Sequence, residues 1–146
     1  MIDGCDQKNV RQCSVDLRIK KLFQIKPNKA VVTFSKNDVS AEELKLPYAL
    51  KPGEHVLAST IEKINQKSTR FGSLIIPRSR TFRMGLSIES GLTSPQYKGE
   101  IIFGIRNISE NKIKLQEKDS LVQAVFFEIE SDTIPLDFTY MNGRVV

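Results

Sequence analysis

The sequence predicts an all-β fold, and three observations support this prediction. Polar and apolar residues alternate with a period of two along residues 14–19, as they do in a half-buried strand. Turn signals rich in glycine, proline and asparagine recur between segments of this kind, at residues 51–53, 94–95 and 142–143. Apolar residues almost nowhere recur with the period of an amphipathic helix. Many short strands with frequent turns and little helix are typical of a β-sandwich, a jelly roll or a barrel.

Further strands are expected along the chain, each rich in the Val, Ile, Phe and Thr residues that suit a pleated surface. They cover residues 30–34, 55–61, 73–76, 100–105, 112–115 and 121–129. The best helix candidate is residues 40–44, with Ser40 as N-cap, and Pro47 would end it after about one turn. Because no repeat or long linker divides the chain, residues 1–146 are expected to form a single domain, with residues 137–146 as a flexible C-terminal tail.

Composition narrows the class of protein. The chain has 146 residues, which at roughly 100–200 residues per domain predicts one domain, and 40% of them are apolar, enough for a core. The 22 basic and 17 acidic residues give a net charge of +5, which suits an anionic ligand but does not separate a polynucleotide from a nucleoside triphosphate. No apolar run approaches the roughly 18–20 residues of a membrane span, so no membrane partner is expected.

Cysteine and histidine are too few for a metal centre. Cys5 and Cys13 are the only cysteines and His55 the only histidine, whereas a structural zinc site usually needs four ligands. We therefore expect no protein-held metal, and we expect both thiols to be reduced in a cytoplasmic protein. His55 lies in an alternating run, where a strand residue is a simpler interpretation than a member of a catalytic triad.

A cluster of arginines is the first candidate binding site. Residues 70–83 hold four arginines in fourteen positions, with Ser79 and Thr81 as hydroxyl donors. Arginine binds phosphate through two parallel hydrogen bonds, and we expect the loop after an apolar strand to present the cluster. The alternative, a solvated basic rim, stays open. Surface aromatics are not interleaved with these arginines, which argues against a nucleic-acid partner.

Residues 89–100 form a second candidate cluster. Gly91 and Gly99 permit tight backbone turns, and Tyr97 could offer its ring to a sugar or a base. The alternative for Tyr97 is an ordinary aromatic residue at the start of a strand.

At these clusters the chain resembles the dCTP deaminase and dUTPase superfamily. Residues 11–19, Arg-Gln-Cys-Ser-Val-Asp-Leu-Arg-Ile, are similar to the deaminase opening strand, and residues 50–62 are similar to its Pro-Gly-Glu-Phe-Val-Leu-Ala-Ser-Thr segment. Pro77-Arg78-Ser79 resembles the second dUTPase motif, while residues 91–101 and 121–126 resemble the third and fourth.

The resemblance implies a distorted jelly-roll β-barrel that assembles as a homotrimer, with nucleotide sites between subunits. It implies that the site binds dCTP or dUTP and that Mg²⁺ is held mainly by the phosphates. Tyr97 would stack on the deoxyribose, where a 2′-hydroxyl would clash, and Arg83 would lie at the deaminase catalytic centre. The residues expected to face the triphosphate are Arg78, Ser79, Gln123 and Arg80, which replaces a deaminase serine.

Two departures from the family pattern affect catalysis. Ser94 stands where dUTPases have the aspartate that activates water, and Gly104 stands where deaminases have a proton-shuttling glutamate. Glu89 is the first neighbour that could substitute. Two main functions therefore stay open: an enzyme of deoxypyrimidine nucleotide metabolism, or a catalytically silent relative acting as a nucleotide sensor, decoy or protein-interaction module. A third, less favoured, is a structural or nucleic-acid-binding trimer that uses the arginine cluster.

Overall fold

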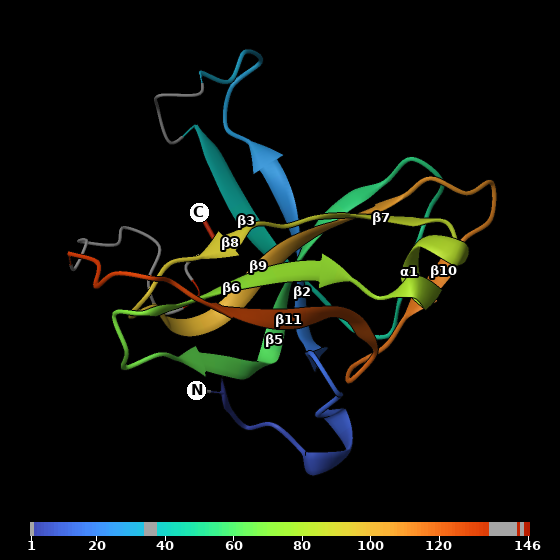
Figure 1. The fold of residues 1–146 in the computed structure, drawn as a ribbon. Helices are drawn as coiled ribbons and strands as arrows, with labels where there is room; N and C mark the ends of the chain where they lie inside the picture. The colour runs from blue at the N-terminus through green and yellow to red at the C-terminus, as the bar shows by residue number, and fades with distance from the viewer. Residues whose placement is uncertain (1, 34–37, 135–142, 144) are drawn as a thin grey trace.

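The structure, a computed structural model, describes residues 2–33, 38–134, 143, 145 and 146. Within these residues the chain is almost entirely β, with one short helix and one 3-10 turn (Figure 1). The elements are β1 (Ile2–Asp3), η1 (Gln7–Asn9), β2 (Val15–Pro27), β3 (Val39–Leu44), β4 (Tyr48–Leu50), β5 (His55–Asn65), β6 (Phe71–Pro77), α1 (Ser79–Arg83), β7 (Leu86–Glu89), β8 (Leu92–Thr93), β9 (Lys98–Asn107), β10 (Ile113–Leu115) and β11 (Ser120–Glu128).

One long antiparallel sheet makes up most of the molecule. Its strands follow the order β7-β9-β5-β2-β11-β6-β8, with β1 added to β5 and β3 added to β2, while β4 and β10 form a separate pair. The sheet curls about β2, whose first residues pair with β11 and whose later residues pair with β5 and β3. Figure 1 shows β6 and β11 crossing in front of β5 and β9 as a result of this curl.

The core lies between the two arms of the curled sheet. Alternate residues of each strand point inward and pack into one cluster, which includes Leu17, Ile19, Val56, Ala58, Ile75, Phe103, Ile105, Val122 and Ala124. The residues between them point outward because successive side chains of a strand alternate between its faces. Asp16, Gln123, His55 and Gly104 therefore lie on outer faces of the sheet.

A buried ion pair links β2 to β5. Glu62 is 0% exposed, and its Oε1 accepts a hydrogen bond from Nε of Arg18 at 2.6 Å. Its Oε2 accepts a second bond from the Arg18 backbone N–H at 2.7 Å. The other side of the Arg18 guanidinium pairs with Asp6 at 2.7 Å. Every oxygen of the Glu62 carboxylate is thus paired, as a buried charge requires.

The all-β prediction is confirmed, and most expected strands are present with longer bounds. The strand expected at residues 30–34 is wrong, since residues 30–33 form no strand, Val31 is 78% exposed and Phe34 lies outside the described residues. The helix expected at residues 40–44 is also wrong, because this segment is β3, paired along its length with Leu22–Pro27 of β2. A partner strand offers hydrogen bonds along the whole segment, whereas an isolated helical turn is costly to nucleate.

The loop expected after β6 is instead the single turn of α1. Thr81 anchors it, because its side chain is 2% exposed and its Oγ1 donates a hydrogen bond to the Leu121 carbonyl at 2.6 Å. The predicted tail, residues 137–146, lies mostly outside the described residues. No helix in the described part of the chain has the length and apolar character of a bilayer span.

Candidate functional site

Arg78 stands at the point where β6 ends and α1 begins. Its backbone N–H donates to the Leu121 carbonyl at 2.9 Å, which fixes this corner against the start of β11. Its guanidinium Nε lies 3.3 Å from Oδ1 of Asp16, and its Nη1 donates to the Ser120 carbonyl at 3.3 Å. Asp16 is only 2% exposed, so a buried carboxylate orients a partly exposed guanidinium.

Asp16 holds a second arginine and faces Gln123. Its Oδ2 accepts hydrogen bonds from Arg11, at 2.9 Å from Nε and 2.6 Å from Nη2. Asp16 and Gln123 are direct cross-strand partners on β2 and β11. The Gln123 side-chain oxygen accepts a bond from Ser14 Oγ at 2.8 Å, and its amide nitrogen has no partner among the described residues. The cluster therefore presents two guanidiniums and an amide donor on one outer face.

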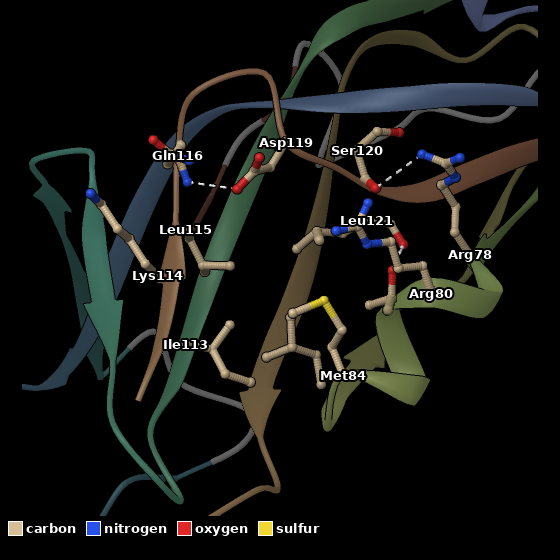
Figure 2. A pocket seen from close by; sticks show the side chains of 12 residues that line it. Arg78, Arg80, Met84, Ile113, Lys114, Leu115, Gln116, Asp119, Ser120 and Leu121 are labelled. Atoms are coloured by element: carbon tan, nitrogen blue, oxygen red, sulfur yellow. Dashed lines mark hydrogen bonds between the residues drawn. The ribbon is translucent and has the colours of Figure 1, made fainter. Parts of the chain in front are cut away.

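A cavity of about 300 Å³ adjoins this cluster. Figure 2 shows Arg78, Arg80 and Met84 on one side of it, and Ile113, Leu115 and Gln116 on the other. Ser79 and Arg83, by contrast, are exposed on α1 and do not line this cavity. Among the residues expected to bind phosphate, the structure thus brings Arg78 and Arg80 to one cavity.

Tyr97 belongs to a different cavity, of about 350 Å³, near β6, β8 and β9. Its walls are formed by Ile75, Gly91, Leu92, Thr93, Tyr97, Ile101, Ile102 and Val145. The Tyr97 hydroxyl donates to the Glu100 carbonyl at 2.7 Å. Burial raises the pKa of Tyr97, the charge of Glu100 raises it further, and a backbone hydrogen bond from Gly143 acts in the opposite direction. The phenol is therefore neutral at physiological pH, with an apolar space beside its ring.

The two cavities have no lining residue in common. The residues expected to contact a nucleotide consequently fall into two groups on one chain, an arginine group beside α1 and the Tyr97 group.

Gly104 lies directly beneath a contact between Glu89 and His55 that the sequence did not reveal. It pairs with Glu89 of β7 on one side and Leu57 of β5 on the other. Above it, Oε2 of Glu89 lies 3.3 Å from Nε2 of His55. This contact can be predicted only when the register of β5, β9 and β7 is known. The sequence alone therefore indicates no more than a strand residue at His55.

Ser94, which stands where dUTPases have an aspartate, has a hydroxyl in place of the carboxylate. Its backbone carbonyl accepts the Tyr97 N–H at 3.2 Å, so it closes the turn before β9. Within the described residues no three His, Cys, Asp or Glu side chains gather in a way that could hold a metal ion. Cys5 and Cys13 are both free thiols.

Curated relatives carry names from deoxypyrimidine metabolism. A probable deoxyuridine 5′-triphosphate nucleotidohydrolase of Methanothermobacter thermautotrophicus is 29% identical over 122 residues, covering 83% of this chain and 81% of that protein. A dUMP-forming dCTP deaminase of Streptomyces avermitilis is 28% identical over 152 residues, covering 98% of this chain and 78% of that one.

Solved structures share the fold. The 2′-deoxycytidine 5′-triphosphate deaminase of Agrobacterium tumefaciens superposes with a TM-score of 0.67 at 18% identity, over 86% of this chain and 42% of that one. The native EIAV dUTPase superposes with a TM-score of 0.58 at 19% identity, over 95% of this chain and 98% of that one. The distorted jelly roll of the dUTPase type is thereby confirmed. The family model described as dCTP deaminase-like matches residues 1–129, and the chain belongs to this family.

Proposed function

We propose that this protein binds a pyrimidine deoxynucleoside triphosphate, dCTP or dUTP. The observation that carries the proposal is the pairing of the buried Asp16 carboxylate with the guanidiniums of Arg11 and Arg78. The single carboxylate of Asp16 orients both guanidiniums, and the three charges together leave the cluster with a net positive charge. Guanidiniums held in this way bind phosphate oxygens through paired, charge-assisted hydrogen bonds.

The expected triphosphate contacts extend along this face. Gln123 supports phosphate binding because it lies opposite Asp16 across the β2–β11 pair, and its amide nitrogen has no partner among the described residues. Arg80 supports it from the cavity wall, while Ser79 and Arg83 lie exposed on the same short helix. These assignments follow the family resemblance, and the substrates named for the two curated relatives support the choice of a deoxypyrimidine nucleotide.

Tyr97 supports binding of the nucleoside end. Its ring lines an apolar cavity large enough for a pentose and part of a base, since ligand pockets of this kind begin at about 300 Å³. A ring packed against the face of deoxyribose leaves no room for a 2′-hydroxyl, which would make the site selective for deoxynucleotides.

The separation of the two residue groups supports a homotrimer. A nucleotide that contacts both the arginine group and the Tyr97 group would take them from different subunits. Mg²⁺ would then enter with the triphosphate, because the described residues offer no carboxylate cage and the ion's preferred partners are phosphate oxygens and water. A cytoplasmic location remains a prediction, consistent with the two free thiols.

A second candidate function is binding without turnover. Gly104 has no side chain and Ser94 no carboxylate, so the two positions that carry the general base in the family cannot supply one here. Loss of a general base costs about 10²–10⁴-fold in rate. A protein of this kind would act as a nucleotide sensor, a decoy or a protein-interaction module.

Calorimetric titration tests the binding proposal. dCTP and dUTP, each with Mg²⁺, are expected to bind at least tenfold more tightly than CTP, UTP or dATP. Arg78→Ala is expected to weaken binding about tenfold, the loss of one charge-assisted contact. Arg70→Ala is the matched control, because Arg70 precedes the other end of β6 and pairs with Glu128. Absence of binding by every deoxynucleotide would refute the proposal.

A further inference from the structure

We infer that the cavity between α1 and β10 binds an acidic segment of a protein partner, which inserts one bulky apolar side chain as an anchor. The inference does not depend on nucleotide binding. It gives a defined surface to the protein-interaction role, which the second candidate function leaves without a place on the chain.

Part of the cavity wall is apolar and serves no purpose in phosphate binding. The side chains that form this part are Met84, Leu86, Ile113, Leu115 and Leu121. Figure 2 shows Met84 on the α1 side of the cavity and Ile113 opposite it on the β10 side. A charged phosphate buried against apolar side chains would lose hydration without gaining a polar partner. A triphosphate held by the arginines would therefore leave this wall uncovered, whereas an apolar side chain would cover it.

The volume of the cavity agrees with an anchor of this size. At about 300 Å³ it lies at the lower end of the range for ligand pockets. This space suits one bulky side chain of a peptide together with its immediate neighbours.

The apolar surface continues outside the cavity, along the turn that ends α1. Phe82 is 55% exposed, Met84 is 51% exposed and Ile108 is 65% exposed. Two backbone hydrogen bonds hold these segments together, because the Gly85 N–H donates to the Phe82 carbonyl at 3.1 Å and the Ile108 N–H donates to the Gly85 carbonyl at 2.9 Å. Exposed apolar residues that are scattered singly are ordinary, but a group of them beside an apolar cavity marks an interaction site.

The rim of the cavity is basic, and two of its cations are unpaired. Arg78, Arg80 and Lys114 line the cavity together with a single carboxylate, Asp119. Asp119 is already engaged, since its Oδ2 accepts a backbone N–H of its own turn at 2.8 Å, and Arg78 is paired with a buried carboxylate. Among the residues that the structure describes, Arg80 and Lys114 form no ion pair. Carboxylates that flank the anchor would supply the missing partners, as in the recognition of acidic motifs by arginine clusters.

Charge and surface chemistry favour this partner over two others. A second copy of the chain would bring a net charge of +5 toward a surface that is itself basic, so electrostatics oppose self-association here. A single-stranded nucleic acid would pair with the cations and leave the apolar wall uncovered. Its bases would also lack stacking partners, because Phe82 is the one exposed aromatic side chain in the described part of this surface.

Selection from a displayed library of short random peptides, with the protein immobilised, tests the inference. Enriched peptides are expected to share a Leu, Ile, Met or Phe that has Asp or Glu on both sides. The most enriched peptide, labelled with fluorescein, is then titrated with the protein, and binding is followed by fluorescence anisotropy. A selection that enriches no shared pattern, or one that enriches basic or neutral peptides, would overturn the inference.

Two variants address the two parts of the surface. Met84→Ser removes apolar contact area and is expected to weaken peptide binding about tenfold, since burial of a methionine side chain stabilises a complex by at least this factor. Lys114→Glu reverses one charge of the rim and is expected to weaken binding about tenfold at low salt. The effect of Lys114→Glu should shrink at high salt, because salt screens exposed charges, whereas the effect of Met84→Ser should not.

Each variant has a matched control in a distant loop. Val31→Ser removes an apolar side chain that is 78% exposed in the loop after β2. Lys67→Glu reverses the charge of an exposed lysine in the loop that precedes β6, at the opposite end of that strand from Arg78. Both controls should bind the peptide with the wild-type affinity.

The outcomes separate this inference from the proposed function. Weaker peptide binding in Met84→Ser and Lys114→Glu, with both controls unchanged, supports the inference. Unchanged binding in Met84→Ser refutes it, and if a single-stranded oligonucleotide then binds more tightly than the peptide, the surface is a site for polyanions. Calorimetric titration of dCTP on the same wild-type sample tests the proposed function separately, because either ligand can bind when the other does not.

Discussion

Asp16 lies on β2 and Arg78 lies between β6 and α1, and the buried carboxylate of Asp16 orients the Arg78 guanidinium across 3.3 Å. Asp16 also binds Arg11 through its other oxygen. Asp16 is itself too buried to contact a ligand, but it orients two arginines that can. Ligand affinity in this region should consequently depend on a side chain that contacts no phosphate.

Asp16→Asn is expected to weaken dCTP and dUTP binding about tenfold, because the amide keeps the shape but no longer holds both guanidiniums. It is also expected to lower the free energy of unfolding by about 1.5–3 kcal/mol, the range for hydrogen bonds to charged groups. Calorimetry and urea denaturation measure the two effects. A folded variant with unchanged affinity would show that Arg78 needs no orientation by Asp16.

Glu62→Gln is expected to lower the free energy of unfolding by about 3–5 kcal/mol, since it removes the buried partner of an ion pair and leaves Arg18 with only the half-exposed Asp6 as a counter-charge. Glu43→Gln is the control. It breaks an exposed pair with Lys21 and should leave the free energy of unfolding nearly unchanged, because solvent screens this pair. Denaturant titration of both variants checks the contrast, and equal costs would contradict the role assigned to burial.

Tyr97→Phe should change the pH dependence of stability only at alkaline pH. Burial, the largest cause, raises the pKa of Tyr97 in the folded protein above its unfolded value of about 10. The stabilisation from the protonated phenol is then fully present below pH 10 and is lost as pH rises through the folded pKa. Loss of stability above pH 10 should therefore be shallower in Tyr97→Phe than in the wild type.

Tyr48→Phe provides a comparison for this pH dependence. The pKa of Tyr48 is raised chiefly by the hydrogen bond that its hydroxyl donates to Glu54 at 2.6 Å. Tyrosinate absorbance, measured on both variants from pH 8 to 12, assigns each titration. A Tyr97 that titrates at the value of free tyrosine would contradict its burial.

Gly143→Ala is expected to displace the C-terminal residues from the Tyr97 cavity. Gly143 has a φ of +73°, and an added Cβ would lie 2.8 Å from the Glu100 Cβ. With Val145 withdrawn, the Tyr97 ring should react severalfold faster with tetranitromethane, as followed by mass spectrometry. Gly53→Ala is matched in backbone strain, with a φ of +76°, but its Cβ would meet nothing within 4 Å. It should leave the nitration rate of Tyr97 unchanged.

The strands could be predicted from the sequence because their signal is local. The alternation of polar and apolar residues at 14–19 and 55–61 arises because one face of each strand is buried. This pattern can be recognised without knowing which strand pairs with it. The segment at residues 40–44 was misassigned as helix for the complementary reason. Its strand conformation depends on pairing with β2, and the segment itself contains no sign of that pairing.

The site was predictable only in part. Arg78, Tyr97 and Gln123 lie in recognisable motifs, and each occupies a cavity wall or a cluster face. The link between Arg78 and Asp16, and that between Glu89 and His55, depend on strand register, which a single sequence does not specify. Gly104 illustrates the difference. The sequence shows only that a glycine replaces the glutamate of the family pattern, whereas the structure shows that the Glu89 side chain occupies the space above this glycine.

The central position of β2 has a consequence for biosynthesis. Leu17 and Ser120 are joined by a hydrogen bond across a separation of 103 residues, so the curled sheet cannot close until β11 has been made. A nascent chain would carry the unpaired edge of β2 through most of its translation, the kind of exposure that invites aggregation or chaperone binding. Such non-local pairing also favours folding in milliseconds to seconds instead of microseconds. Joining the chain's ends and opening it between β10 and β11 would place β11 before β2, with only residues 129–146, β1 and η1 between them, and the permuted protein should fold faster than the natural order.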